Sequence, residues 1–283
     1  MRNTTGVSPR PFRQVDVFTA TPYLGNPVAV VLDATDLSTG EMQRFARWTN
    51  LSETTFVLPP TDPQADYRVR IFTPALELTF AGHPTLGTCH AWLEAGGTPL
   101  QPDVVVQECG AGLVRVRRSG DQLAFAEPPL VRSGPVEETL VERVADALNI
   151  DRSAIVDSQW ADNGPGWIAV LLGSAEEVLA LSPSPVDLDI GVVGPHPPGS
   201  PYAFEVRAFC LENGAMVEDP VTGSLNASLA EWLLRMDRAT VPYTAAQGAA
   251  LGRAGVVEIS RDSEGTIWVG GSSITCLTGE VGL

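Results

Sequence analysis

The sequence predicts an α+β fold of two similar lobes, each with a mostly antiparallel sheet and one long central helix. The first observation is a repeat: R-x-F, a loop, P-x-x-G-[ST] and an apolar helix occur twice, about half the chain apart. One copy contains Arg70–Phe72 and Pro84–Thr88, and the other contains Arg207–Phe209 and Pro220–Ser224. The second observation is that strand patterns outnumber helix patterns, which disfavours a doubly wound sheet.

Strands in the first half are predicted from apolar or alternating runs. They lie around Val15–Phe18, Val28–Leu32, Thr54–Leu58 and Tyr67–Phe72. A capping box at Ser38–Glu41 predicts a helix that ends near Asn50. The strand at Tyr67–Phe72 leads into the first copy of the repeat, whose apolar run predicts the central helix.

We expect the boundary between the two halves near Pro128–Pro129 or Gly134–Pro135. Apolar residues at helical spacing predict an amphipathic helix over 136–148. A Pro-rich stretch, Ser182–Pro201, predicts a loop with strand potential only around Ile190–Val193, and the tail contains two further strand patterns. We expect an N-terminal lobe of residues 1–127, completed by 274–283, and a C-terminal lobe of residues 128–273.

Composition excludes several classes of protein. The chain has 283 residues and a net charge of −16, which argues against nucleic acid or an anionic membrane as a partner. No apolar run approaches the length of a transmembrane segment. The start at Met1–Thr5 leads into Pro and Arg, not into an apolar leader, and the four cysteines lack paired spacing. These features predict a cytoplasmic protein.

Every one of the eighteen basic residues is arginine, so the chain contains no lysine. Schiff-base chemistry, including pyridoxal-phosphate catalysis, and a Walker-type phosphate loop are therefore excluded. None of the three histidines is paired with cysteine or carboxylate at a zinc spacing. We expect neither a metal nor a cofactor.

The candidate catalytic carboxylate is Glu53, which lies where a helix ends and a strand begins. A carboxylate in a partly dry cleft has a raised pKa and can both take and return a proton, although most loop glutamates are simply solvated. His83 and Asp219 each precede a helix. Each also has a simpler explanation, as a structural histidine and as an N-cap.

The two repeat loops also offer backbone and hydroxyl groups to a ligand. Gly87 and Gly223 lie in the first turns of the two central helices, with Thr88 and Ser224 beside them. Glycines allow a ligand to approach backbone amides closely, and a helix N-terminus attracts anions. Two such termini that face one cleft would bind a small carboxylate.

Five ordered motifs closely resemble the phenazine-biosynthesis isomerase (PhzF-like) family. They are Gly25–Val30, Asn50–Phe56, Phe72–Pro74, Phe80–Thr88 and Glu218–Ser224. The resemblance implies the fold of diaminopimelate epimerase, with two pseudo-symmetric lobes, each a sheet wrapped around a central helix, and the active site between them. It also implies a homodimer.

By this resemblance, Glu53 matches the family's catalytic glutamate, and Gly82 and His83 match its active-site Gly-His pair. Asp219 and Ser224 match its D-x-x-T-G-S motif. The related epimerases use one cysteine in each helix-entry loop, but the matching loops here contain none. Cys89 and Cys210 lie outside those loops and are interpreted as small buried hydrophobes. A one-base mechanism therefore fits better than a two-thiol racemase.

The sequence thus predicts a cofactor-independent isomerase that moves a proton between carbons of a small carboxylated metabolite. Glu53, His83 and Asp219 are the catalytic candidates, and Gly82, Gly87, Thr88, Gly223 and Ser224 are the substrate-binding candidates. Two alternatives stay open: an amino-acid racemase or epimerase with a base other than cysteine, and a non-catalytic relative that only binds a small molecule.

Overall fold

The computed structural model describes residues 8–120, 122–212 and 214–283, so the N-terminal start on which the expected absence of a leader rested lies outside the described residues. The chain divides into two compact units. Unit 1 comprises Met1–Phe125 and Gly271–Leu283, and unit 2 comprises Ala126–Gly270. Among the described helices, none has both the length and the hydrophobicity of a bilayer-spanning segment.

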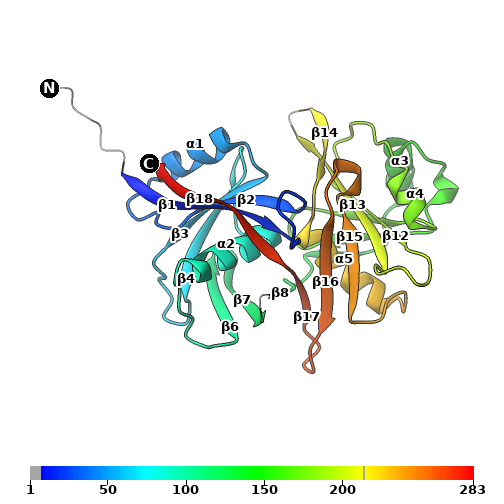
Figure 1. Ribbon diagram of the computed structural model, residues 1–283. Helices are drawn as coiled ribbons and strands as arrows, with labels where there is room; N and C mark the ends of the chain where they lie inside the picture. The colour runs from blue at the N-terminus through cyan, green and yellow to red at the C-terminus, as the bar shows by residue number, and fades with distance from the viewer. Residues whose placement is uncertain (1–7, 121, 213) are drawn as a thin grey trace. The chain divides into compact units, whose positions relative to one another are not determined.

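Unit 1 is a mixed sheet with two helices (Figure 1). Its elements are β1 (Pro9–Val17), β2 (Asn26–Val31), α1 (Thr39–Thr49), β3 (Glu53–Leu58), β4 (Tyr67–Phe72), β5 (Glu77–Leu78), α2 (Gly82–Glu94), β6 (Val104–Cys109), β7 (Gly112–Ser119), β8 (Gln122–Ala126) and β18 (Ser273–Gly282). The strands pair in the order β18-β1-β2-β3-β4-β6-β7-β8, and β5 forms a hairpin with β4. Among these pairs of described strands, β2–β3 and β4–β6 are parallel and the others are antiparallel.

Unit 2 has the same order of strand pairing. Its elements are β9 (Arg132–Gly134), α3 (Glu138–Leu148), β10 (Asp157–Asp162), β11 (Ile168–Leu171), α4 (Ala175–Leu179), β12 (Ile190–Pro195), β13 (Phe204–Glu212), β14 (Ala215–Asp219), α5 (Gly223–Arg235), β15 (Tyr243–Gln247), β16 (Gly255–Arg261) and β17 (Ile267–Gly271). The order is β9-β10-β11-β12-β13-β15-β16-β17, with β14 as a hairpin on β13. Here β11–β12 and β13–β15 are the parallel pairs.

Several elements form as their local sequence predicts. Ser38 caps α1, and its hydroxyl accepts from the Glu41 amide while the Glu41 side chain accepts from the Ser38 amide. The helix ends at Asn50, which adopts the left-handed conformation (φ 55°). The predicted strand at Tyr67–Phe72 and the amphipathic helix α3 are both present. Mostly antiparallel pairing within each unit is confirmed.

The last residues of the chain belong to unit 1. β18 runs antiparallel to β1 along its length, from Pro9 opposite Gly282 to Val17 opposite Ser273. Figure 1 shows this pairing as a red strand beside a blue one. The ten residues of β18 thus pair with the nine residues of β1, so strands from near the two ends of the sequence lie side by side in one sheet.

Each parallel pair is linked by a crossover helix, because parallel strands cannot be joined by a tight turn. In unit 1, α2 connects β5 to β6 and packs on β1, β2 and β3. In unit 2, α5 connects β14 to β15 and packs on β10 and β16. Both helices are buried on nearly every side, including their first turns. A helix that is apolar all round belongs inside a core.

The other face of each sheet carries its own core. In unit 1, Met42 and Phe45 of α1 pack on Phe56 and Phe72. In unit 2, Val144 of α3 and Val178 of α4 belong to a cluster with residues of β11 and β12. The sheet of each unit is therefore covered on both faces, and its central helix, α2 or α5, lies in the more completely buried layer.

Gly87 tests how closely α2 packs. A Cβ at this position would lie 2.3 Å from Val28 Cγ1 and 2.9 Å from Val17 Cγ2. Gly87→Ala should therefore destabilise the protein by about 1–3 kcal/mol, because the core must shift to admit one methyl group. The measurement is the midpoint of urea unfolding.

Gly40 provides the matched control, because it is also helical but exposed, with open space around a new Cβ. Gly40→Ala should be neutral or stabilise by up to about 1 kcal/mol, through the smaller entropy of the unfolded chain. Equal shifts in the two variants would contradict close packing at Gly87.

Candidate active site

Glu53 and His83 lie together in unit 1. Glu53 is the first residue of β3, and His83 is the second residue of α2. Oε2 of Glu53 is 3.3 Å from Nε2 of His83, and the side chains are 15% and 5% exposed. The structure thus brings the predicted carboxylate beside the predicted histidine, and Gly82 precedes that histidine as the first residue of α2.

His83 is neutral in the folded protein. Burial lowers the pKa of its imidazole to about 3, and a hydrogen bond with the Pro27 backbone opposes that shift only in part. A neutral imidazole carries one proton. The side-chain amide nitrogen of Asn26 lies 3.3 Å from Nδ1. The roles of the two ring nitrogens in this contact depend on the tautomer. The approach of Nε2 to Glu53 Oε2 is a close contact that lacks the geometry of a hydrogen bond.

Asn26 is a site residue that the sequence did not single out. It is the first residue of β2 and fully buried. Gly25 allows the chain to approach β1 there, because a Cβ would lie 2.2 Å from the Val17 carbonyl oxygen. The Gly-Asn-Pro motif was available as a signal, but a lone asparagine shows no pattern that separates a turn residue from a hydrogen-bond donor.

Gly87 and Thr88 have a packing role in place of the expected ligand contact. Both are buried within α2, and the Thr88 side chain is 0% exposed. The Thr88 hydroxyl donates to Thr55 Oγ1 at 2.8 Å, which joins α2 to β3. The Gly87 amide also lies beyond the first turn, where amides donate to the carbonyl four residues earlier. We therefore leave these two residues out of the proposed site.

Asp219 belongs to unit 2, where it is the last residue of β14. The expected N-cap role is wrong, because the residue before α5 is Thr222. The carboxylate instead accepts a hydrogen bond of 2.6 Å from the Thr222 hydroxyl. Asp219 is therefore held at the end of a strand, three residues before the helix.

A buried amide network supports this loop, and the sequence did not reveal it. The Gln247 side-chain nitrogen donates to the Asp219 carbonyl (3.1 Å) and to Thr222 Oγ1 (2.9 Å). Its oxygen accepts from the Thr222 amide (3.0 Å) and from Asn226 Nδ2 (2.9 Å). Gln247 and Asn226 are 1% and 2% exposed. A single glutamine at the end of a strand carries no local signal for such a role.

Gly223 and Ser224 are the first two residues of α5. Their amides lie in the first turn, where a helix leaves donors without internal acceptors. Trp167 Nε1 donates to Ser224 Oγ at 3.1 Å, and Asn163 Nδ2 donates to the Ser224 carbonyl at 2.9 Å. These contacts fix the position of Ser224 at the start of the helix.

The two cysteines named from the sequence differ in burial. Cys89 is fully buried, and burial raises the pKa of its thiol to about 12, so it does not form a thiolate near neutral pH. Cys210 is partly exposed, so its interpretation as a buried residue is wrong. Within the described ranges, no group of three or more Cys, His, Asp or Glu side chains is arranged to hold a metal ion.

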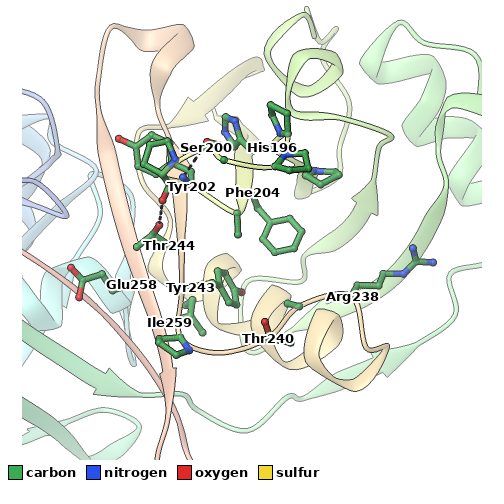
Figure 2. Close-up of a pocket in the computed structure, with 18 of the residues that line it drawn as sticks. His196, Ser200, Tyr202, Phe204, Arg238, Thr240, Tyr243, Thr244, Glu258 and Ile259 are labelled. Atoms are coloured by element: carbon green, nitrogen blue, oxygen red, sulfur yellow. Dashed lines mark hydrogen bonds between the residues drawn. The ribbon is translucent and has the colours of Figure 1, made fainter.

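A cavity of about 740 Å³ lies elsewhere in unit 2. Figure 2 shows Tyr202, Phe204 and Tyr243 among its lining residues, below the Pro-rich loop that carries His196. None of the candidate catalytic or binding residues lines it. Its volume alone does not connect it with the chemistry of Glu53 or Asp219.

Comparison with known proteins identifies the family. The model of the phenazine biosynthesis-like protein family (PhzC-PhzF) matches residues 15–279. Antisense-enhancing sequence 1 of Schizosaccharomyces pombe is 37% identical, with 95% of this chain and 97% of the relative covered. The trans-2,3-dihydro-3-hydroxyanthranilate isomerase of Pseudomonas aeruginosa is 35% identical, with 84% and 86% covered.

Solved structures agree with the fold. A PhzF-family phenazine biosynthesis protein of Bacillus anthracis superposes with a TM-score of 0.82 at 22% identity, covering 97% of this chain and 99% of that one. A hydroxyproline epimerase of Agrobacterium vitis superposes with a TM-score of 0.59 at 14% identity, covering 100% and 94%. The fold is a mixed α/β fold similar to that of the proline racemase and epimerase proteins.

The chain belongs to the phenazine biosynthesis-like protein family. Within it, the chain is a PhzF-like isomerase.

The neutral state of His83 predicts a dependence of stability on pH. Between the ordinary histidine pKa of 6.5 and the folded-state value of about 3, the unfolded chain binds a proton that the folded protein does not. Stability should therefore fall as the pH drops below about 6.5, by up to about 1.4 kcal/mol per pH unit from this group. Urea unfolding at pH 6.5, 5.5 and 4.5 measures the slope.

His83→Asn is the comparison variant, because it cannot take up this proton while all other titrating groups are retained. Its stability should depend less steeply on pH than that of the wild type over the same range. Parallel slopes would show that His83 titrates normally in the folded protein.

Proposed function

We propose that this chain is a cofactor-independent isomerase in which Glu53 moves a proton between two carbons of a small carboxylated metabolite. One observation supports this most directly: the Glu53 carboxylate is only 15% exposed and faces His83 at 3.3 Å. His83 is neutral, so it places no positive charge beside Glu53. A carboxylate in such surroundings keeps the basicity that proton abstraction requires.

The proposed reaction uses one base on one face of the substrate. Glu53 takes a proton from a carbon that is acidified by a neighbouring unsaturated group, which leaves a delocalised anion and a protonated Glu53. Glu53 then returns this proton, or in heavy water a deuteron after its carboxyl proton has exchanged with solvent, to another carbon of that anion, so the base is regenerated and no redox change occurs. His83 and Asp219 bind and polarise the substrate in this scheme.

The first turns of the central helices are the proposed carboxylate receptors. Gly82 begins α2, and Gly223 and Ser224 begin α5. Amides at a helix N-terminus attract anions and stabilise negative charge that develops during the reaction. The contacts of Trp167 and Asn163 with Ser224 support this role, because they hold the residue in one place.

We infer that the two units are pseudo-symmetric lobes, each with its sheet wrapped around the central helix, as expected for domains of residues 1–127 with 274–283 and 128–273. The identical order and sense of strand pairing in the two units supports this. We further propose a homodimer, from the family resemblance, and a cytoplasmic location. All four cysteines are described and are free thiols, which agrees with a reducing compartment.

The names of the relatives suggest a substrate class for this proposal. Two of them, from Pseudomonas aeruginosa and Pseudomonas fluorescens, are named for isomerisation of trans-2,3-dihydro-3-hydroxyanthranilate. That compound is a small carboxylate with a mobile double-bond system, so it is the first compound to test. Other dihydro-aromatic hydroxy acids, amino acids and small enolisable acids complete the panel.

Replacing the base should abolish the reaction without unfolding the protein. We expect Glu53→Gln to lower turnover by at least about 10³-fold, because general acid–base catalysis contributes on this scale. Proton NMR in heavy water measures both isomerisation and incorporation of deuterium at each carbon of the panel compounds. The wild type should exchange one position as the double bond shifts.

Glu142→Gln is the matched control, since Glu142 is exposed on α3. It should retain wild-type turnover and exchange. A Glu53→Gln variant with full activity would remove Glu53 from the mechanism. Loss of stereochemical purity in an amino acid without a double-bond shift would point to a racemase, and binding of a panel compound without exchange would point to a non-catalytic role.

A further inference from the structure

Gln247 holds two different parts of the loop that carries Asp219. It is the last residue of β15 and 1% exposed. Its amide makes four hydrogen bonds, two as a donor and two as an acceptor, and three of them reach Asp219 or Thr222. A buried side-chain amide with this many partners has its orientation fixed, since its donors and acceptors cannot be exchanged without loss.

The orientation of the Thr222 hydroxyl follows from that of Gln247. A threonine hydroxyl has one proton to donate and two lone pairs. Because Gln247 Nε2 donates to Thr222 Oγ1 at 2.9 Å, one lone pair is used and the hydroxyl proton is left for Asp219. Oγ1 lies 2.6 Å from Asp219 Oδ2, the short distance typical of a donor to a carboxylate. The bonds run from Gln247 through Thr222 to Asp219.

The backbone around Gln247 also packs closely on the loop. Gly248 has a φ of 95°, and a Cβ there would lie 2.6 Å from the Pro220 carbonyl oxygen. A Cβ at Gly255 would lie 2.3 Å from Val221 Cγ2. The strand end that presents Gln247 is therefore in direct contact with the residues between Asp219 and Thr222.

We propose that Gln247 is a positioning residue of the isomerase: it fixes the Thr222 hydroxyl proton on the Asp219 carboxylate and keeps that carboxylate ionised and oriented. Gln247 acts only through Thr222 and the Asp219 backbone. The expected effect on turnover rests on the proposed role of Asp219 in the reaction. The expected effect on the titration of Asp219 does not depend on that role.

Gln107 in unit 1 offers a matched control. It is the counterpart on β6, the strand that follows α2, and it is 0% exposed. Its amide nitrogen donates to Thr85 Oγ1 at 2.9 Å, but the Thr85 hydroxyl donates to the Ala81 carbonyl. A buried glutamine that donates to a threonine hydroxyl thus occurs there too, but without a carboxylate at the end of the chain of hydrogen bonds.

The experiment compares Gln247→Leu and Gln107→Leu with the wild type. The Asp219 carboxyl is titrated by carbon-13 NMR in the absence of substrate, with Asp219→Asn to assign its signal. Loss of a donated hydrogen bond weakens the ionised form, so Gln247→Leu should lower the acid dissociation constant of Asp219 by about tenfold. Gln107→Leu should leave it unchanged, although both variants lose stability.

Gln247→Glu is the second variant, in case the leucine variant does not fold. The glutamate keeps acceptors for the Thr222 amide and Asn226. It lacks the donors to Thr222 Oγ1 and the Asp219 carbonyl. Gln247→Glu should therefore lower the acid dissociation constant of Asp219 at least as much as Gln247→Leu does. The charged neighbours of the loop are retained in every variant: Glu218 paired with Arg207 at 2.7 Å, and Arg253 beside Gly248. An Asp219 titration that is unchanged in both Gln247 variants would overturn the proposal.

Kinetics separate this proposal from the proposed function. With an active substrate, Gln247→Leu should lower kcat about tenfold with a smaller change in KM, and Thr222→Val should have the same effect, since it removes the group through which Gln247 acts. A shift of the Asp219 titration without any change in kcat would support the hydrogen-bond chain and reject Asp219 as part of the mechanism. Activity of Glu53→Gln would reject the proposed function and leave the Asp219 titration as a valid test.

Discussion

The structure of each unit depends on burying the first turn of its central helix, α2 in unit 1 and α5 in unit 2. The first amides of a helix have no internal acceptors, and polar groups taken out of water must be hydrogen-bonded inside the protein. In α2 and α5 this turn lies in the core, packed against the sheet. In unit 2 the Gln247 side-chain oxygen accepts from the Thr222 amide before α5, and in unit 1 the Gln107 side-chain nitrogen donates to the Thr85 hydroxyl in the first turn of α2.

This constraint also creates the chemistry. His83 is neutral because the start of α2 is buried, so it places no positive charge beside Glu53, the carboxylate proposed to take the proton. In water the same pair would form a histidinium–carboxylate contact at mildly acidic pH, and the carboxylate would be a weaker base. Burial of a helix terminus, which packing requires, thus provides the surroundings that proton transfer requires.

Local sequence was sufficient for elements whose determinants lie within a few residues. The capping box before α1 and the alternation of β4 are examples. The repeat indicated the two central helices, α2 and α5. Glu53 and His83 were paired only through the family resemblance, because nothing in their spacing shows that β3 and α2 meet. Gly87 and Thr88 show the limit most clearly. A small residue in a helix can face a ligand or a neighbouring strand, and only tertiary packing decides between them.

The buried glutamines could not be predicted for a related reason. Gln107 and Gln247 become partners of the helix starts only when parallel pairing places β6 beside β4 and β15 beside β13. The N-cap expected at Asp219 failed by three residues, because Thr222 ends the loop and Asp219 completes the β14 hairpin. A single polar residue gives little local signal in the sequence about its contacts in the fold. Most of the candidate site consists of such residues.

The hydrogen-bond chains at the two helix starts end on different groups, and this difference agrees with the proposed one-base mechanism. In unit 1 the chain from Gln107 through Thr85 ends on a backbone carbonyl, and the carboxylate proposed to react, Glu53, comes from the neighbouring strand. In unit 2 the chain from Gln247 through Thr222 ends on the carboxylate of Asp219. A carboxylate that accepts a short hydrogen bond is a weak base. The proposed scheme accordingly assigns the proton transfer to Glu53 and substrate binding to Asp219.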